Sequence, residues 1–235
     1  MLTRRSILIG IALTSSGLIS VRGEQREGQV VLVGDSIFDN AAYVSSGPAV
    51  IDQLKSALPS QWTATLLAVD GATTASISRQ LSKLPSDTTH IVISVGGNDA
   101  LSHKGLLDDK AESVAEVSRL AEIQRSFRAA YKSMLDQVTA LGIPTAACTI
   151  YNSRYPNLAE REIANVGLTI FNDVITQEAA IHGLPVIDLR MIFHSDDDYA
   201  NSVEPSSKGG RKIAAAITRL VNLHQFDGES LMLVQ

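Results

Sequence analysis

The sequence contains little that supports a disulfide scaffold, a membrane span or an aromatic stacking site. Its single cysteine, Cys148, excludes an intrachain disulfide, and the apolar run around it, Ala146–Ile150, predicts burial as a small hydrophobic residue. Aromatic residues make up 5% of the chain, which indicates a pocket without a large stacking platform. The uncharged apolar stretch at residues 7–19 is too short to cross a bilayer comfortably, so no stable membrane span is expected in the mature chain.

Basic charge is also scarce. Of the 20 Lys and Arg residues, Arg4, Arg5 and Arg22 lie in residues 1–23, which hold no acid, and this leaves 17 basic against 25 acidic residues. Because nucleic acid binding depends on neutralising phosphates, such a chain is not expected to bind nucleic acid. No glycine-rich nucleotide-binding pattern follows the first predicted strand. The acidic run Asp196–Asp198 has no second cluster at the spacing of a calcium loop, so we predict a solvated loop and neither a metal nor a cofactor.

Residues 1–23 have the layout of an export signal. The basic pattern Thr3-Arg4-Arg5 precedes the apolar run and is similar to a twin-arginine signal. The small residue Gly23 is compatible with cleavage before Glu24. We therefore expect export to the periplasm or the extracellular space, with a cytoplasmic or N-terminally membrane-tethered chain as the alternative.

The remainder, residues 24–235, has the pattern of one domain in which short apolar runs alternate with longer helical patterns. The five predicted strands are Val30–Val33, Thr63–Val69, His90–Val95, Thr145–Tyr151 and Pro185–Leu189. Near-continuous apolar runs of this kind are typical of parallel strands that are covered on both faces. We therefore predict a flavodoxin-like, three-layer α/β/α sandwich with a five-stranded parallel sheet.

Three helices are expected to cover this sheet with apolar stripes. Apolar residues recur at helical spacing between strands three and four, between strands four and five, and in a last helix at about 208–223. The first stripe is Val114, Val117, Leu120, Phe127, Tyr131, Met134, Val138 and Leu141, the second is Ile163, Val166, Ile170, Val174 and Ile175, and the third is Ile213, Ile217 and Leu220.

Unusual residues follow three of the strands, at the edge of a parallel sheet where ligands bind. Ser36, in Gly34-Asp35-Ser36-Ile37, falls where a helix should begin, so the helix dipole and free N–H groups would stabilise an anion beside its hydroxyl. Gly71 follows the second strand, and Asn98 follows the third. Each alone is also explained as an N-cap, a turn glycine or an Asx cap. Together, the Ser36 N–H, the Gly71 N–H and the Asn98 amide predict an oxyanion hole for acyl transfer.

In order and spacing over residues 30–222, GDSI, the glycine after strand two and GGND resemble the first three blocks of the SGNH/GDSL hydrolases. The resemblance implies a flavodoxin-like sandwich. It also implies metal-free hydrolysis of carboxylic esters, thioesters or sugar O-acetyl groups through an acyl-serine intermediate. It makes Ser36 the nucleophile and assigns Ser36, Gly71 and Asn98 to the oxyanion hole.

The final block departs from the family pattern. Where the family has an Asp, two residues and then the catalytic His, this sequence has Asn201-Ser202-Val203-Glu204. Loss of a triad member lowers the rate by about 10⁴-fold or more, so another base is needed. The candidates are Glu204 itself, if burial raises its pKa, and His194 or His103, which lie on loops at the expected catalytic end.

We therefore predict a hydrolase that acts on a small-molecule ester through an acyl-Ser36 intermediate with an unconventional base. The alternative is a binding protein that keeps the scaffold and the crevice for an acylated or glycosidic ligand without turning it over.

Overall fold

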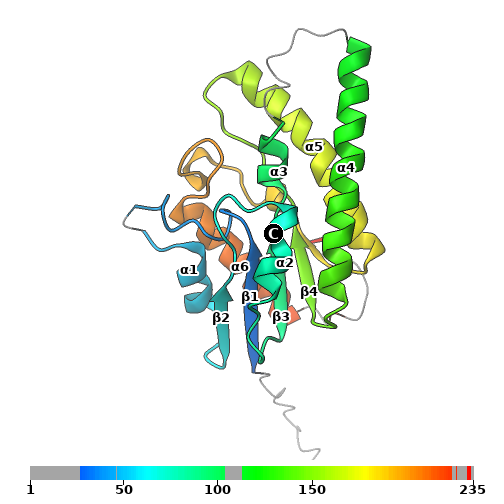
Figure 1. The fold of residues 1–235 in the computed structure, drawn as a ribbon. Helices are drawn as coiled ribbons and strands as arrows, with labels where there is room; N and C mark the ends of the chain where they lie inside the picture. Colours follow the sequence, from blue (N-terminus) through cyan, green and yellow to red (C-terminus); the bar gives the residue numbers. More distant parts are fainter. Residues whose placement is uncertain (1–26, 46, 104–112, 224–225, 227–231, 234–235) are drawn as a thin grey trace, which may run out of the picture.

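The structure, a computed structural model, describes residues 27–45, 47–103, 113–223, 226 and 232–233 of the 235-residue chain (Figure 1). The export signal predicted at residues 1–23 lies outside the described residues.

Parallel strands form one sheet in the order β2-β1-β3-β4-β5-β6. Their bounds are β1 Gly28–Gly34, β2 Trp62–Leu66, β3 His90–Ser94, β4 Thr145–Cys148, β5 Val186–Ile187 and β6 Met232–Leu233. The order of the first five strands is that of a flavodoxin-like fold, so the predicted three-layer sandwich and its five strands are confirmed. The sequence did not indicate β6, a two-residue strand that pairs with β5.

The second, fourth and fifth strands are shorter than predicted. After β2, the N–H groups of Leu67 and Ala68 both donate to Leu32 O, so the regular ladder stops before Val69. β4 and β5 end at Cys148 and Ile187, so the loops that follow these strands also begin earlier than the apolar pattern suggests.

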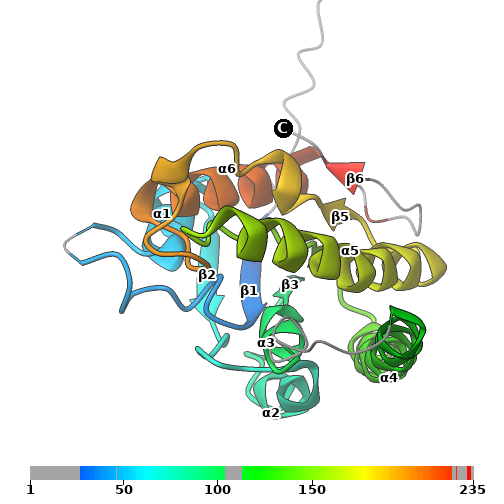
Figure 2. The ribbon, with the colours of Figure 1, turned by 90° about the horizontal axis from the view of Figure 1, so that it is seen from above.

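Helices cover both faces of the sheet. Figure 2 shows α1 (Val50–Ala57) and α6 (Ser207–Leu223) on one side, and α2 (Ile77–Leu81) and α4 (Ser113–Thr139) on the other. The helix α5 (Leu158–Ile181) packs beside α4, and the short α3 (Gly97–Leu101) follows β3. Side chains along β1 alternate between the two cores, as the pleat of a strand requires.

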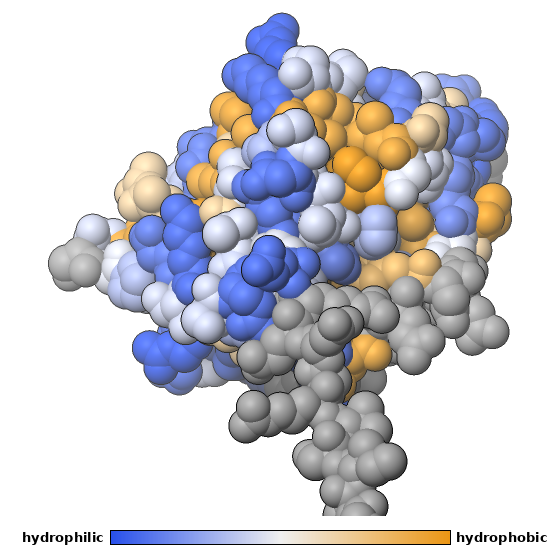
Figure 3. All heavy atoms as spheres, turned by 90° about the horizontal axis from the view of Figure 1, so that it is seen from below, coloured by the Kyte–Doolittle hydropathy of each residue, from blue (hydrophilic) through white to orange (hydrophobic). Residues whose placement is uncertain are grey.

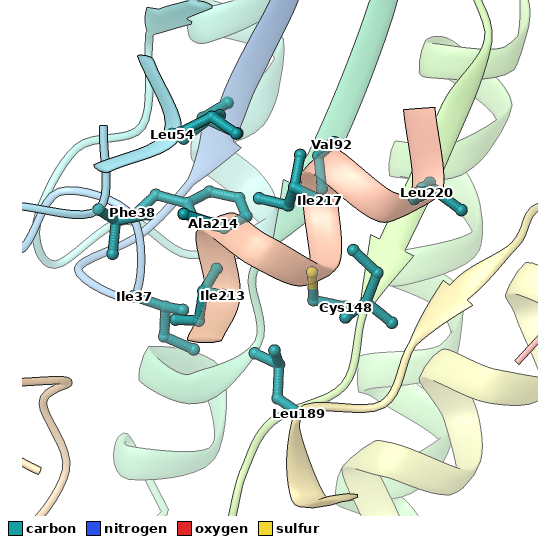
Figure 4. Close-up of a cluster of buried hydrophobic side chains, with 14 of the residues drawn as sticks. Ile37, Phe38, Leu54, Val92, Cys148, Leu189, Ile213, Ala214, Ile217 and Leu220 are labelled. Atoms are coloured by element: carbon teal, nitrogen blue, oxygen red, sulfur yellow. The ribbon is translucent and has the colours of Figure 1, made fainter. Parts of the chain in front are cut away.

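The core beneath α6 contains Cys148. Figure 4 shows this β4 side chain among the apolar residues of α6, where Ile213, Ile217 and Leu220 are fully buried as predicted. Cys148 is 1% exposed, and burial raises the pKa of its thiol, so the thiol remains uncharged. The prediction of a buried, structural cysteine is confirmed.

The two long helices extend beyond the sheet at the end where the strands finish (Figure 1). The 27 residues of α4 and the 24 residues of α5 span about 40 and 36 Å, whereas a five-residue strand spans about 17 Å. The first halves of both helices therefore have no sheet to pack against. Val117, Ile163 and Val166 are 65%, 49% and 67% exposed, so the prediction that they face the sheet was wrong.

The later members of both stripes, including Tyr131, Val138, Val174 and Ile175, are buried as predicted. Leu141 is an exception, because it lies past the end of α4 and is 45% exposed.

The opposite end of the sheet, where the strands begin, is seen from below in Figure 3 and mixes hydrophilic and apolar surface. The C-terminal ends of α4 and α5 lie at this end of the sheet, because each helix leads into the start of the next strand. Within the described part of the chain, no helix is both long and apolar enough to cross a membrane.

Candidate active site

Ser36 lies in a tight turn directly after β1. Gly34 ends the strand with a φ of 143°, and a side chain there would collide with the Ser94 carbonyl oxygen, so glycine is required. The Asp35 N–H donates to the same carbonyl at 3.0 Å, which fixes the start of the turn. Ser36 follows at the carboxyl end of the sheet with 7% of its surface exposed.

The helix that the sequence predicted to begin at Ser36 is replaced by a single turn. Asn40 draws the chain away from a helical path, because its Nδ2 donates to Pro205 O at 3.1 Å while its Oδ1 accepts from the Val50 N–H at 2.9 Å. A helix dipole is therefore not available to Ser36. Its backbone N–H, however, donates to no acceptor among the described residues and stays open to a ligand.

The hydroxyl of Ser36 meets the carboxyl group of Glu204, 168 residues away in sequence. Ser36 Oγ donates to Glu204 Oε1 at 3.0 Å. Both side chains are buried, with exposed fractions of 7% and 9%. The fold therefore brings together the serine and the acidic residue that stands at the position of the family's histidine.

Three hydrogen bonds fix the turn that carries Glu204. Asn201 Oδ1 accepts from the N–H groups of both Val203 and Glu204 at 2.9 Å, as in an Asx turn. The Tyr151 hydroxyl donates to Val203 O at 2.7 Å. Asn201, which replaces the family's aspartate, thus holds the backbone of Glu204 rather than the ring of a histidine.

Burial is the main cause that raises the pKa of Glu204 above its usual range; the hydrogen bond from Ser36 lowers it, and the charge of Asp70 raises it further. The second carboxyl oxygen, Oε2, is buried and has no hydrogen-bond partner among the described residues. A carboxylate with a raised pKa and one unused oxygen is a stronger proton acceptor than an exposed glutamate.

A second carboxyl group, that of Asp35, is also buried at the site, with 1% of the residue exposed. From the sequence, Asp35 was expected only to form part of the turn. Burial, aided by the charges of Glu204 and Asp99, raises its pKa to about 8, although the N–H of Ile37 donates to it. Burial therefore favours the protonated form of Asp35. The position of Asp35, directly after an apolar strand and beside the candidate nucleophile, is the sequence feature that could have indicated a buried acid.

Asn98 lies on the wall of the same cavity as Ser36, at the start of α3. Its Nδ2 donates to Ala72 O at 3.0 Å, which ties the loop after β3 to the loop after β2 and leaves the second amide hydrogen for a ligand.

Gly71 lies in that second loop with a φ of 76°, a conformation that favours glycine. It is exposed and is not part of the cavity wall, but its N–H donates to no acceptor among the described residues. The loop is fixed by Asp70, whose N–H donates to Asp39 and whose carboxyl group accepts from the Tyr43 hydroxyl.

Neither candidate histidine is the hydrogen-bond partner of the Ser36 hydroxyl, which donates to Glu204. His103 is exposed and lines the cavity just past α3. His194 is exposed, lies outside the cavity wall, and uses its backbone N–H to bind Asp198. In this structure the acceptor of the Ser36 proton is Glu204.

Asp196–Asp198 is not a uniformly solvated loop. Asp198 is fully buried and pairs with Lys212 at 2.7 Å, while exposed Asp196 pairs with Arg154. Within the described ranges, no cluster of three or more His, Cys, Asp or Glu side chains has the geometry to hold a metal ion.

The cavity beside Ser36 encloses about 1030 Å³ of empty space, including the part open to solvent. Ser36, Asn98 and Glu204 lie on its wall together with apolar side chains of α3, α4 and α5 and residues of the loop after β4. A buried serine that donates to a carboxylate on the wall of a mostly apolar cavity is compatible with acyl transfer.

Comparison with known proteins identifies the family of the chain. The model of the GDSL-like lipase/acylhydrolase family matches residues 32–212, and the chain belongs to that family. No functionally curated protein sequence matches the chain.

Solved structures with the same fold include several enzymes of lipid and ester hydrolysis. Phospholipase A1 from Streptomyces albidoflavus is 19% identical with a TM-score of 0.61, over 84% of this chain and 99% of that one. A lipase/acylhydrolase from Enterococcus faecalis is 21% identical with a TM-score of 0.59, over 83% and 95%. An acetyl xylan esterase is 17% identical with a TM-score of 0.57, over 83% and 99%. At these identities the likeness shows the fold.

Proposed function

We propose that the protein hydrolyses carboxylic esters through an acyl-Ser36 intermediate, with Glu204 as the general base. Membership of the GDSL-like lipase/acylhydrolase family supports a hydrolase of ester substrates. The observation that carries the mechanism is the 3.0 Å hydrogen bond from Ser36 Oγ to Glu204 Oε1.

In the first half of the reaction, Ser36 Oγ attacks the ester carbonyl carbon while its proton passes to Glu204. The negative charge on the carbonyl oxygen is stabilised by the N–H groups of Ser36 and Gly71 and by the free amide hydrogen of Asn98. Glu204 then gives its proton to the departing alcohol oxygen as the C–O bond breaks, which leaves an acyl-serine.

In the second half, a water molecule attacks the acyl carbon and gives its proton to Glu204. The second tetrahedral intermediate collapses to the carboxylic acid, and the proton on Glu204 returns to Ser36 Oγ. Because burial raises the pKa of Glu204, the same group serves as acceptor and donor nearer to neutral pH than an exposed glutamate would.

The test is hydrolysis of p-nitrophenyl esters by the wild type and by Ser36→Ala. We expect turnover by the wild type and a fall of about 10⁴-fold or more in the variant. An exposed serine on α1, Ser56, provides the matched control as Ser56→Ala. Absence of turnover by folded wild type would contradict the proposal.

A binding protein on the same scaffold is the second candidate, and the replacement of the family's histidine by Glu204 is the observation that favours it. It predicts thermal stabilisation by an ester or its analogue without hydrolysis. The same samples distinguish the two, because a hydrolase releases p-nitrophenol and a binding protein does not.

We also propose that residues 24–235 form one domain that is exported after removal of residues 1–23. The basic and apolar layout of those residues supports export, as does the extracellular lipase from Streptomyces rimosus among the structures with this fold. N-terminal sequencing of secreted protein is expected to begin at Glu24, and a chain that retains residue 1 would contradict cleavage.

A further inference from the structure

The surroundings of Ser36 differ on its two sides. On the β2 side, Asp39, Tyr43 and Asp70 form a hydrogen-bonded polar group: the Asp70 N–H donates to Asp39 at 2.9 Å, and the Tyr43 hydroxyl donates to Asp70 at 2.7 Å. Asp70 is exposed, so this side of the site is polar, acidic and wet.

On the β3 side, the wall is mostly apolar, although His103, Ser153 and Tyr155 also lie on it. Leu120 and Ile123 of α4 face the cavity together with Leu168 and Phe171 of α5. Leu120, Ile123 and Leu168 belong to the first halves of the two helices. Ile123 and Phe171 are buried, with 8% and 6% exposed, where α4 and α5 pack together. The cavity thus extends from Ser36 along a wall of mostly apolar side chains from α3, α4, α5 and the loop after β4, and we call this part of it the channel.

Gly167 lies on the wall of this channel, in the interior of α5. A Cβ built at this position would meet no atom within 4 Å, so neither a backbone contact nor a positive φ requires glycine here. Glycine in the interior of a helix makes the helix less stable than alanine would, and no contact of Gly167 explains why glycine is there. What it leaves is space inside the channel.

We propose that this channel binds the acyl chain of a medium- or long-chain ester and that Gly167 determines the chain length that fits. The proposal rests on the proposed function of Ser36. The polar alcohol group of the ester then lies on the β2 side, where it leaves into water beside Asp70. An acyl chain is the ester component whose burial in such a channel is favourable, at a gain for every methylene group.

The experiment compares kcat/KM for p-nitrophenyl acetate and octanoate among the wild type, Gly167→Leu and a control, Thr169→Leu. Thr169 lies two residues along α5, is exposed and is not part of the cavity wall. We expect the wild type to prefer octanoate by roughly tenfold or more. Gly167→Leu should remove that preference and retain acetate hydrolysis, while Thr169→Leu should keep the wild-type ratio. Ala164→Leu, on the same wall one turn earlier, should act like Gly167→Leu.

Misfolding does not explain the expected result, because leucine in place of a helical glycine should leave the melting temperature of the variant unchanged or higher. If the wild type hydrolyses both esters and Gly167→Leu has the same octanoate-to-acetate ratio, the channel is not the acyl site.

A second readout is independent of catalysis. Thermal stabilisation by 1-octanol should occur in the wild type and Thr169→Leu and be lost in Gly167→Leu. If the wild type hydrolyses no ester, the function proposed for Ser36 fails, and this measurement alone decides the channel. Loss of stabilisation in Gly167→Leu then supports apolar chain binding, whereas equal stabilisation of all three proteins overturns it.

Discussion

Replacing Glu204 with Gln is expected to lower the rate of ester hydrolysis and to raise the free energy of unfolding. Glutamine keeps the size of the side chain and an oxygen that accepts the hydrogen bond from Ser36 Oγ, but its amide does not accept a proton at neutral pH. A positioned general base contributes about 10²- to 10⁴-fold to a rate. We therefore expect kcat of Glu204→Gln to fall by that factor, which corresponds to about 3 to 5.5 kcal/mol of activation free energy.

The stability of the same variant should change in the opposite direction. Glu204 is 9% exposed and its Oε2 has no partner among the described residues, so folding buries a charge that is incompletely compensated. Its pKa is therefore raised in the folded state, and the free energy of unfolding of the wild type decreases as pH rises from the usual glutamate range through the raised pKa. A neutral glutamine should increase the free energy of unfolding at pH 8 by on the order of 1 kcal/mol, with a smaller difference near pH 4.

The assay pairs initial rates of p-nitrophenyl ester hydrolysis with urea unfolding at pH 8 and pH 4. Glu162→Gln, an exposed position on α5, removes the same charge without touching the site. Retention of kcat within about threefold by folded Glu204→Gln would refute Glu204 as the general base. A lower free energy of unfolding at pH 8 would refute the argument from burial.

Three further predictions concern the surroundings of Ser36. Because the pKa of Asp35 is raised to about 8, the folded state keeps a proton that the unfolded state loses, so stability should fall between about pH 4 and 8; Asp35→Asn should flatten this slope in urea unfolding series. Asn98→Ala should lower kcat by about 10²- to 10³-fold, measured on the same esters, and an unchanged kcat would remove Asn98 from the oxyanion hole. Asn201→Ala should lower kcat by roughly tenfold because the turn that carries Glu204 loses two hydrogen bonds, whereas Asn201→Asp, which keeps an acceptor oxygen, should restore most of it. Equal kcat in both Asn201 variants would show that the turn does not depend on this side chain.

Much of the fold was predictable because strands buried on both faces and helices with apolar stripes leave strong local patterns. The errors occurred where tertiary context overrides the local pattern. Val117 and Val166 keep helical spacing with their stripes, yet they are exposed because α4 and α5 outrun the sheet. The helix expected at Ser36 does not form, because Asn40 binds Pro205, 165 residues away, as well as the nearer Val50.

The candidate site was partly readable from the sequence for a similar reason. The turns after parallel strands lie at one edge of the sheet, so the approach of Ser36 to Asn98 follows from topology. The partner of the Ser36 hydroxyl did not follow, because a loop 168 residues away supplies it and the sequence offered two histidines as well. The raised pKa of Asp35 depends on the whole core around it.

The most direct measurement of the central claim is the site and rate of covalent labelling by a fluorophosphonate. Peptide mapping by mass spectrometry should find the adduct on Ser36 in the wild type, and the labelling rate should fall in Glu204→Gln and rise with pH through the raised pKa of Glu204. An adduct on another residue, no adduct in folded wild type, or equal labelling rates in the wild type and Glu204→Gln would contradict a Ser36 nucleophile activated by Glu204.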